Sequence, residues 1–168
     1  MSGTITDQAL AFLQQHQPLP PTAEMSAALL DRFEEVRQHF VDAPDERAIP
    51  LLLGALSQGD GHGVFQLVED CLQQHPKHVV VPHLAAVLRE GRPEARYWAA
   101  TFATGFPHAD LVKPLGELVR TGDSECSTAA IMALDLNDSE EAQALVSQLA
   151  AADPEVAAIL AELRDTEA

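Results

Sequence analysis

Apolar residues recur along this chain in a helical pattern that repeats about every 30 residues. In the first three copies, a helix carries apolar residues at positions 0, +3 and +4, and a glycine follows it. These copies begin at Leu52, Leu84 and Leu115, and a weaker fourth copy begins at Leu145. Residues spaced by three and four share one face of an α-helix. The pattern therefore predicts four helices that each bury one face.

A second helix is expected after each of these turns. It carries an apolar residue eight positions beyond the turn residue in every copy, namely Leu67, Ala99, Ala130 and Leu160. A repeat of this length is typical of stacked helix pairs. The turn glycines Gly59, Gly91 and Gly122 are expected to end the first helices in the left-handed conformation.

Two helices are predicted ahead of the repeats. The first covers residues 6–16 and is capped by Thr6 or Asp7, and the second runs from about Thr22 to Val41. We therefore expect an all-α protein with a single domain over residues 1–168. Residues 1–44 would form the leading helices, and residues 45–168 would form a short α-solenoid of four helix pairs.

Local signals mark several helix starts. Asp153 before Pro154 is a good cap, and Pro93 suits the first position of a helix. Asp138 and Glu141 have the spacing of a capping box. The short run that ends at Pro82 is assigned to the start of a helix.

The copy from Pro82 to Phe106 resembles a HEAT repeat. Its second helix has the Ala95-Arg96 and Ala99-Ala100 pairs of that family's pattern, and the resemblance extends over residues 45–165. It implies a solenoid whose second helices line a concave face. The position of Arg96 is Val, Ser or Ala in the other copies, so a regular Asp–Arg ladder between repeats is not expected.

The net charge of −16 limits the classes of partner that this protein is expected to bind. Nucleic acids and anionic membranes attract basic proteins, so both are disfavoured, whereas a basic protein would be attracted. The alternative is that the charge serves only solubility. The first residues do not resemble a signal peptide, and no apolar run is long enough to span a membrane. We expect a cytoplasmic protein.

The sequence offers no catalytic or cofactor-binding signature. Cys71 and His75 have chelating spacing, but a buried thiol beside a helix-ending histidine is the simpler interpretation. The chain lacks the His-Glu dipeptides of HEAT-like iron hydroxylases, and its acidity does not suit the DNA channel of alkylbase glycosylases, which are also HEAT-like. No nucleophile motif or phosphate loop is present. We expect a non-enzymatic protein without a metal or cofactor.

Two groups of residues are candidates for a protein interface. Arg96, Tyr97 and Trp98 are of the types that anchor interfaces, although Trp98 would equally suit the core. Acidic residues near the turns and on the second helices would suit a basic partner, or would simply be solvated: Asp60, Glu69, Asp70, Glu90, Glu94, Asp123 and Glu125.

These observations favour a non-enzymatic protein-binding scaffold. A short acidic chain with leading helices before four repeats also resembles small HEAT-like immunity proteins that neutralise bacterial toxins. That resemblance implies a basic toxin domain as the partner. The alternatives are an accessory or chaperone-like protein, such as a lyase-type cofactor handler, and a structural adaptor.

Overall fold

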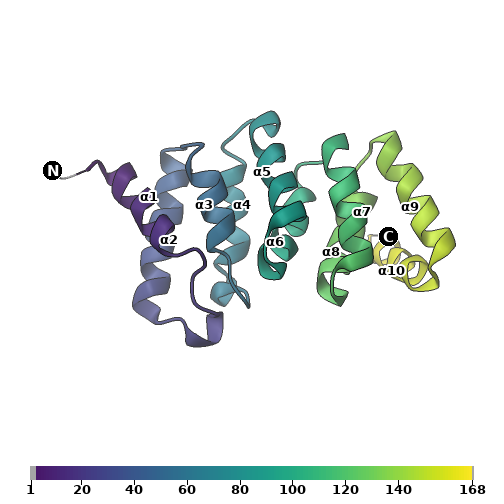
Figure 1. Ribbon diagram of the computed structural model, residues 1–168, viewed down its shortest axis with the longest axis horizontal. Helices are drawn as coiled ribbons and strands as arrows, with labels where there is room; N and C mark the ends of the chain where they lie inside the picture. Colours follow the sequence, from purple (N-terminus) through teal and green to yellow (C-terminus); the bar gives the residue numbers. More distant parts are fainter. Residues whose placement is uncertain (1–2, 168) are drawn as a thin grey trace. The chain divides into compact units, whose positions relative to one another are not determined.

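The computed structural model describes residues 3–167, and this range contains α-helices and short 3-10 helices but no β-strand (Figure 1). The α-helices are α1 (Ile5–Gln15), α2 (Ala27–Asp42), α3 (Ala48–Ala55), α4 (Val68–Leu72), α5 (Lys77–Glu90), α6 (Pro93–Ala103), α7 (Val112–Thr121), α8 (Ser124–Asp135), α9 (Glu140–Ala152) and α10 (Pro154–Thr166). The 3-10 helices are η1 (Thr22–Glu24), η2 (Gly61–Gly63), η3 (Phe65–Leu67) and η4 (Ala109–Leu111). The all-α prediction is confirmed, with two leading helices before the pairs α3/α4, α5/α6, α7/α8 and α9/α10.

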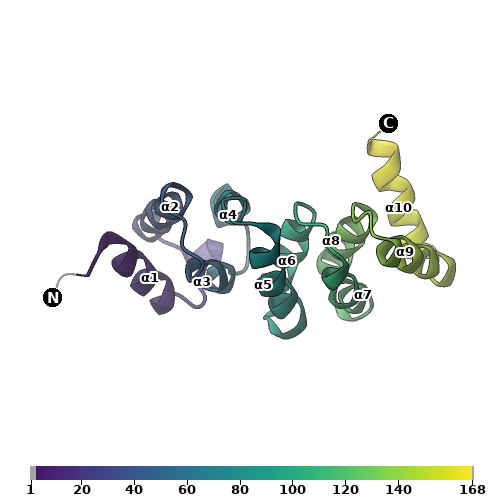
Figure 2. The ribbon, with the colours of Figure 1, turned by 90° about the horizontal axis from the view of Figure 1, so that it is seen from above.

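The chain groups into two compact units, the first ending at His83 and the second beginning at Leu84, within α5. In the first unit, α1 packs against α2 and α3, and α4 packs against the same two helices (Figure 1). In the second unit, α8 packs against α6, α7, α9 and α10 (Figure 2). The central helix of the second unit is therefore α8. The expected single domain over residues 1–168 stays a prediction.

The repeated leucines form the core as expected. Leu52, Leu84 and Leu115 are at most 1% exposed, whereas Leu145 of the weaker fourth copy is only half-buried. On the second helices, Ala99 and Ala130 are fully buried and Leu160 is nearly so, as their spacing predicted. Burial of such apolar side chains is the main stabilising contribution in a helix stack.

The first helix pair departs from the expected register. Leu67 is 37% exposed, and the neighbouring Phe65 and Val68 are buried in its place. The cause is the segment after α3, where Gly59, Gly61, His62 and Gly63 all have positive φ. This left-handed stretch turns the chain through η2 and η3 before α4 begins. The prediction that Leu67 faces the core is therefore wrong.

The expected left-handed C-caps are also wrong at two positions. The N–H groups of Gly91 and Gly122 donate to the carbonyls of Val87 and Leu118 at 2.8 Å, but neither glycine has positive φ. A Cβ atom would lie 2.5 Å from the Val87 oxygen at Gly91, and 2.7 Å from the Leu118 oxygen at Gly122. Close approach of the backbone, rather than φ, requires glycine there. Gly59 is left-handed, at a φ of 97°, but it lies beyond the end of α3.

Two of the expected helix starts are confirmed and one is shifted by a residue. Asp153 caps α10 with Pro154 in the first turn, and α6 begins at Pro93. The cap of α9 is Ser139 rather than Asp138, because the Ser139 hydroxyl accepts a hydrogen bond from the N–H of Ala142 at 3.2 Å.

Three other helix starts differ from the expectation. The cap of α1 is Thr4, which forms a capping box with Asp7, so this helix begins one residue early. The Ser26 hydroxyl accepts from the N–H of Leu29 and begins α2, while η1 occupies the residues before it. The start of α5 is at Lys77, which places Pro82 inside the helix.

Candidate functional site

A groove of about 380 Å³ lies between α6 and α8 in the second unit. It is lined by Tyr97 and Thr101 from α6 and by Thr104, the residue that caps the C-terminus of α6. From α8 it is lined by Ser124, Glu125, Thr128, Ala129 and Met132. These positions share one face of each helix because they are spaced by three and four residues. The groove brings together two of the residues that the sequence indicated, Tyr97 and Glu125.

The apolar part of this groove is exposed. Met132 is 37% exposed, and Leu136, one turn further along the chain, is 46% exposed. The opposite faces of the same helices carry Ala99 and Ala130, which are fully buried. Exposed apolar side chains beside a polar rim are typical of interaction sites.

The groove's threonine hydroxyls are bonded within their own helices. Thr101 donates to the carbonyl of Tyr97 at 2.9 Å, Thr104 to that of Thr101 at 2.7 Å, and Thr128 to that of Ser124 at 2.8 Å. Each hydroxyl proton is therefore used inside the protein, while the oxygen lone pairs remain as acceptors.

The three consecutive residues Arg96, Tyr97 and Trp98 have different environments. Trp98 is only 7% exposed and stacks on Phe102 with ring centroids 5.7 Å apart, which places it in the core. Tyr97 is half-buried and forms a T-shaped pair with Trp98, with ring centroids 5.2 Å apart. Arg96 donates to the carbonyl of Arg89 at 3.2 Å. The aromatic ring at the groove is thus Tyr97.

The acidic candidates of the second unit also have different roles. Asp123 accepts from the N–H of Cys126 at 2.9 Å and caps α8, and these hydrogen bonds lower the pKa of its carboxyl group. Glu94 lies 3.7 Å from Arg92 in an ion pair. Glu90, at the end of α5, is exposed. Among residues 3–167, Glu125 has no salt bridge, and its side chain is exposed at the groove.

A second hollow, of about 270 Å³, lies between the N-terminal ends of α8 and α10. Asp123, Asp153 and Glu155 line it, and the first two cap these helices. Within the described part of the chain, no group of three or more His, Cys, Asp or Glu residues has the arrangement of a metal site. Nor does any described helix combine the length and apolar character that crossing a membrane requires.

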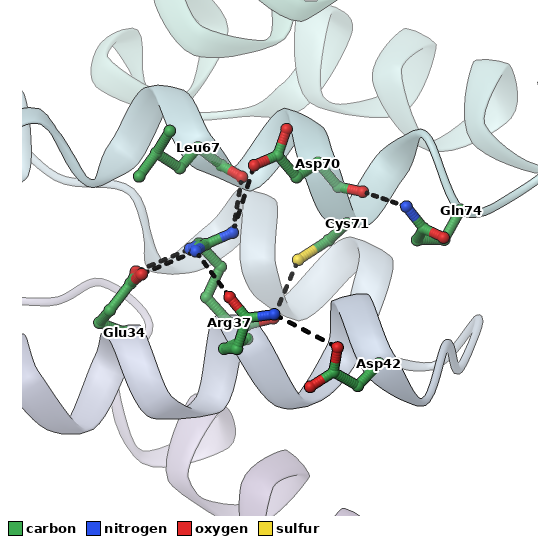
Figure 3. Close-up of polar contacts among 8 residues, drawn as sticks. Glu34, Arg37, Asp42, Leu67, Asp70, Cys71 and Gln74 are labelled. Atoms are coloured by element: carbon green, nitrogen blue, oxygen red, sulfur yellow. Dashed lines mark hydrogen bonds and ion pairs between the residues drawn. The ribbon is translucent and has the colours of Figure 1, made fainter.

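In the first unit, two acidic candidates support local structure. Asp60 accepts from the N–H of His62 at 3.0 Å and caps η2. Glu69 accepts from the side chain of Gln73 at 3.4 Å. The third acidic candidate of this unit, Asp70, belongs to a larger network between α2 and α4 (Figure 3).

The centre of that network is Arg37, whose side chain is 5% exposed. Its Nε and Nη2 atoms each donate to a carboxylate oxygen of Glu34 at 2.7 Å. Its Nη1 atom donates to the carbonyl of Leu67 at 3.2 Å and lies 3.6 Å from Asp70 (Figure 3). The paired hydrogen bonds to Glu34 raise the pKa of Arg37, so the buried guanidinium stays charged.

The sequence contains a signal for this network, which the spacing of apolar residues alone did not reveal. Arg37 follows Phe33 and Val36 and precedes Phe40 on the buried face of α2. A charged residue at a core position is rarely buried without a partner, and Glu34 stands one turn before it. An arginine in the apolar stripe therefore indicated a buried ion pair.

Cys71 completes the contact between α2 and α4, because its thiol donates to the Arg37 carbonyl at 3.3 Å. Burial raises the pKa of this thiol from 9.0 to about 12. Since the thiolate is the nucleophilic form, Cys71 is unreactive at neutral pH. Cys126, in the second unit, is also buried and free, with its pKa raised to about 11, mainly by burial.

The raised pKa of Cys71 predicts a loss of stability at alkaline pH. Above pH 9 the unfolded chain loses this proton while the folded chain keeps it, so stability falls as pH rises toward 12, by up to about 1.4 kcal/mol per pH unit. We expect the stability difference between wild type and Cys71→Ala to shrink as pH rises from 8 to 11, measured by urea unfolding. A stability difference between the two proteins that stays constant with pH would contradict the raised pKa of Cys71.

No curated protein and no solved structure matched this chain. The comparison with protein families did find a match, and it covers helix pairs of this chain. The model of the family described as HEAT repeats matches residues 81–164, which are half of the sequence, and the chain therefore belongs to the HEAT repeat family.

Proposed function

We propose that this protein is a non-catalytic scaffold that binds a basic partner protein through the groove between α6 and α8. HEAT repeats commonly mediate contacts between proteins. The observation that carries the proposal is the combination, in one groove, of the exposed Met132, the half-buried Tyr97 and the carboxylate of Glu125. Aromatic and apolar anchors beside a charged rim are typical of protein interfaces.

The net charge of −16 supports a basic partner. Charge of one sign over a whole protein accelerates its association with a partner of opposite sign and repels similarly charged competitors. The same charge opposes binding to phosphate backbones, so the proposal includes neither nucleic acid nor an anionic membrane. It assigns no catalytic residue, metal or cofactor.

In its more specific form, the proposal is that this scaffold is an immunity protein that occludes a basic toxin domain. The acidity of the chain and its resemblance to small HEAT-like immunity proteins support this form. Occlusion requires only a tight interface over the toxin's functional surface, which a helix stack supplies without chemistry of its own.

Purification of the tagged protein from its native host tests the proposal. We expect mass spectrometry to identify a stoichiometric protein partner whose contact domain is basic, and we expect the complex to weaken as salt rises. Co-expression should restore growth to cells that produce this partner. Recovery of an acidic partner would overturn the basic-partner proposal, and a basic partner that is harmless to cells would overturn the immunity role.

A single charge reversal locates the interface. Asp60 and Asp123 cap helices, so reversing them would disturb folding as well as binding. The cap of α8 is Asp123, so Glu125→Lys leaves that cap in place, and we expect it to weaken partner binding by at least about fivefold, measured by titration calorimetry. Glu117→Lys on α7 is the matched control because it makes the same charge change at an exposed position outside the groove. Equal losses in both variants would place the interface elsewhere.

A further inference from the structure

Three of the five hydroxyl groups that line the groove between α6 and α8 can only accept hydrogen bonds from a ligand, while those of Tyr97 and Ser124 can donate or accept. The hydroxyl protons of Thr101, Thr104 and Thr128 are donated to carbonyls of their own helices. Their oxygens retain lone pairs, and the carboxylate of Glu125 adds an acceptor with full negative charge. A side chain that donates several hydrogen bonds and carries positive charge complements this arrangement.

The apolar parts of the groove require an aliphatic stem on the same ligand. Met132, Ala129 and the ring of Tyr97 share the groove with the threonine oxygens. The volume of about 380 Å³ is at the lower end of the range for small-molecule pockets, which suits one or two side chains better than a cofactor.

We propose that this groove receives an arginine side chain from the partner protein. This inference rests on the proposed function. The guanidinium donates to Glu125 and to threonine oxygens, and the stem packs on Met132 and the Tyr97 ring. Arginine fits better than lysine because its planar group has five donors, is weakly hydrated and stacks on aromatic rings.

The N-terminus of α8 opposes this assignment, since Ser124 and Glu125 stand in the first turn of that helix. A helix N-terminus carries roughly half a positive charge. The carboxylates of Glu125 and of the capping residue Asp123 carry a full negative charge each and stand at the same helix end. Negative charge therefore prevails at this end of the groove.

Nuclear magnetic resonance titration with blocked arginine, N-acetyl-arginine methylamide, tests the proposal on the full chain. We expect saturable, millimolar binding, with amide shifts concentrated in residues 97–104 and 124–132. Blocked citrulline has the same shape without charge, and we expect it to bind at least about fivefold more weakly. Equal binding of citrulline, or arginine shifts spread over the acidic surface, would overturn the proposal.

Two conservative variants test the acceptors separately. Glu125→Gln should weaken binding of blocked arginine at least about fivefold, and Thr128→Val about twofold to fivefold. Thr121→Val is the control, because Thr121 makes the same backbone bond, to the Glu117 carbonyl at 2.8 Å, outside the groove. Unchanged affinity in both groove variants would overturn the assignment.

The outcomes distinguish this inference from the proposed function. If a basic partner binds with wild-type affinity to Glu125→Gln and Thr128→Val, the scaffold proposal survives and the arginine site is wrong. If blocked arginine binds in the groove but no partner protein is recovered, the arginine site survives and the scaffold role loses its support.

Discussion

Leu115→Ala is expected to lower the free energy of unfolding by about 2–5 kcal/mol. Leu115 is 1% exposed on α7, which packs against the central helix α8, so truncation leaves a cavity at the middle of the second unit. Urea unfolding followed by circular dichroism measures this loss, because the signal reports helix content directly.

The matched control is Leu136→Ala at the end of α8. The same truncation there removes a side chain that is 46% exposed, so the expected loss is below about 1 kcal/mol. Equal destabilisation by the two substitutions would contradict the register of the repeats.

Arg37→Ala is expected to destabilise the protein by about 2–4 kcal/mol. The substitution removes the paired hydrogen bonds to Glu34 and the buried stem, and it leaves the Leu67 carbonyl without this donor. Because Arg37 joins α2 to α4, we expect hydrogen exchange to accelerate first in these two helices.

Arg32→Ala provides a control on the same helix. Arg32 makes an ion pair with Glu35 at the same spacing, 3.0 Å long, but the two side chains are 45% and 67% exposed. Such a pair contributes less than about 1 kcal/mol in water. A loss for Arg37→Ala as small as that for Arg32→Ala would show that burial of the Arg37 pair has no energetic consequence.

Much of the fold could be predicted from the sequence because helix packing follows a local period. Leu52, Leu84 and Leu115 occupy the core as their spacing predicted. The prediction that Leu67 is buried was wrong because consecutive left-handed residues change the path of the chain, and spacing alone does not reveal φ. The prediction that Gly91 is a left-handed cap was wrong because close approach to a carbonyl also selects glycine, without requiring positive φ.

The candidate site was predictable only in part. Tyr97 and Glu125 were candidates for an interface because of their residue types, and the structure places both at the groove. Thr128 and Met132 gave no such signal, since threonine and methionine occur throughout helices. Their role depends on which face of α8 remains free after packing against its four neighbouring helices, which a single sequence does not show.

Hydrogen exchange of the protein, alone and with its captured partner, shows whether the groove between α6 and α8 binds that partner. We expect binding to slow exchange in residues 97–104 and 124–132, the segments that line the groove. Protection confined to α1–α4, or to the α7 and α9 helices, would contradict the assignment of this groove as the protein-binding surface.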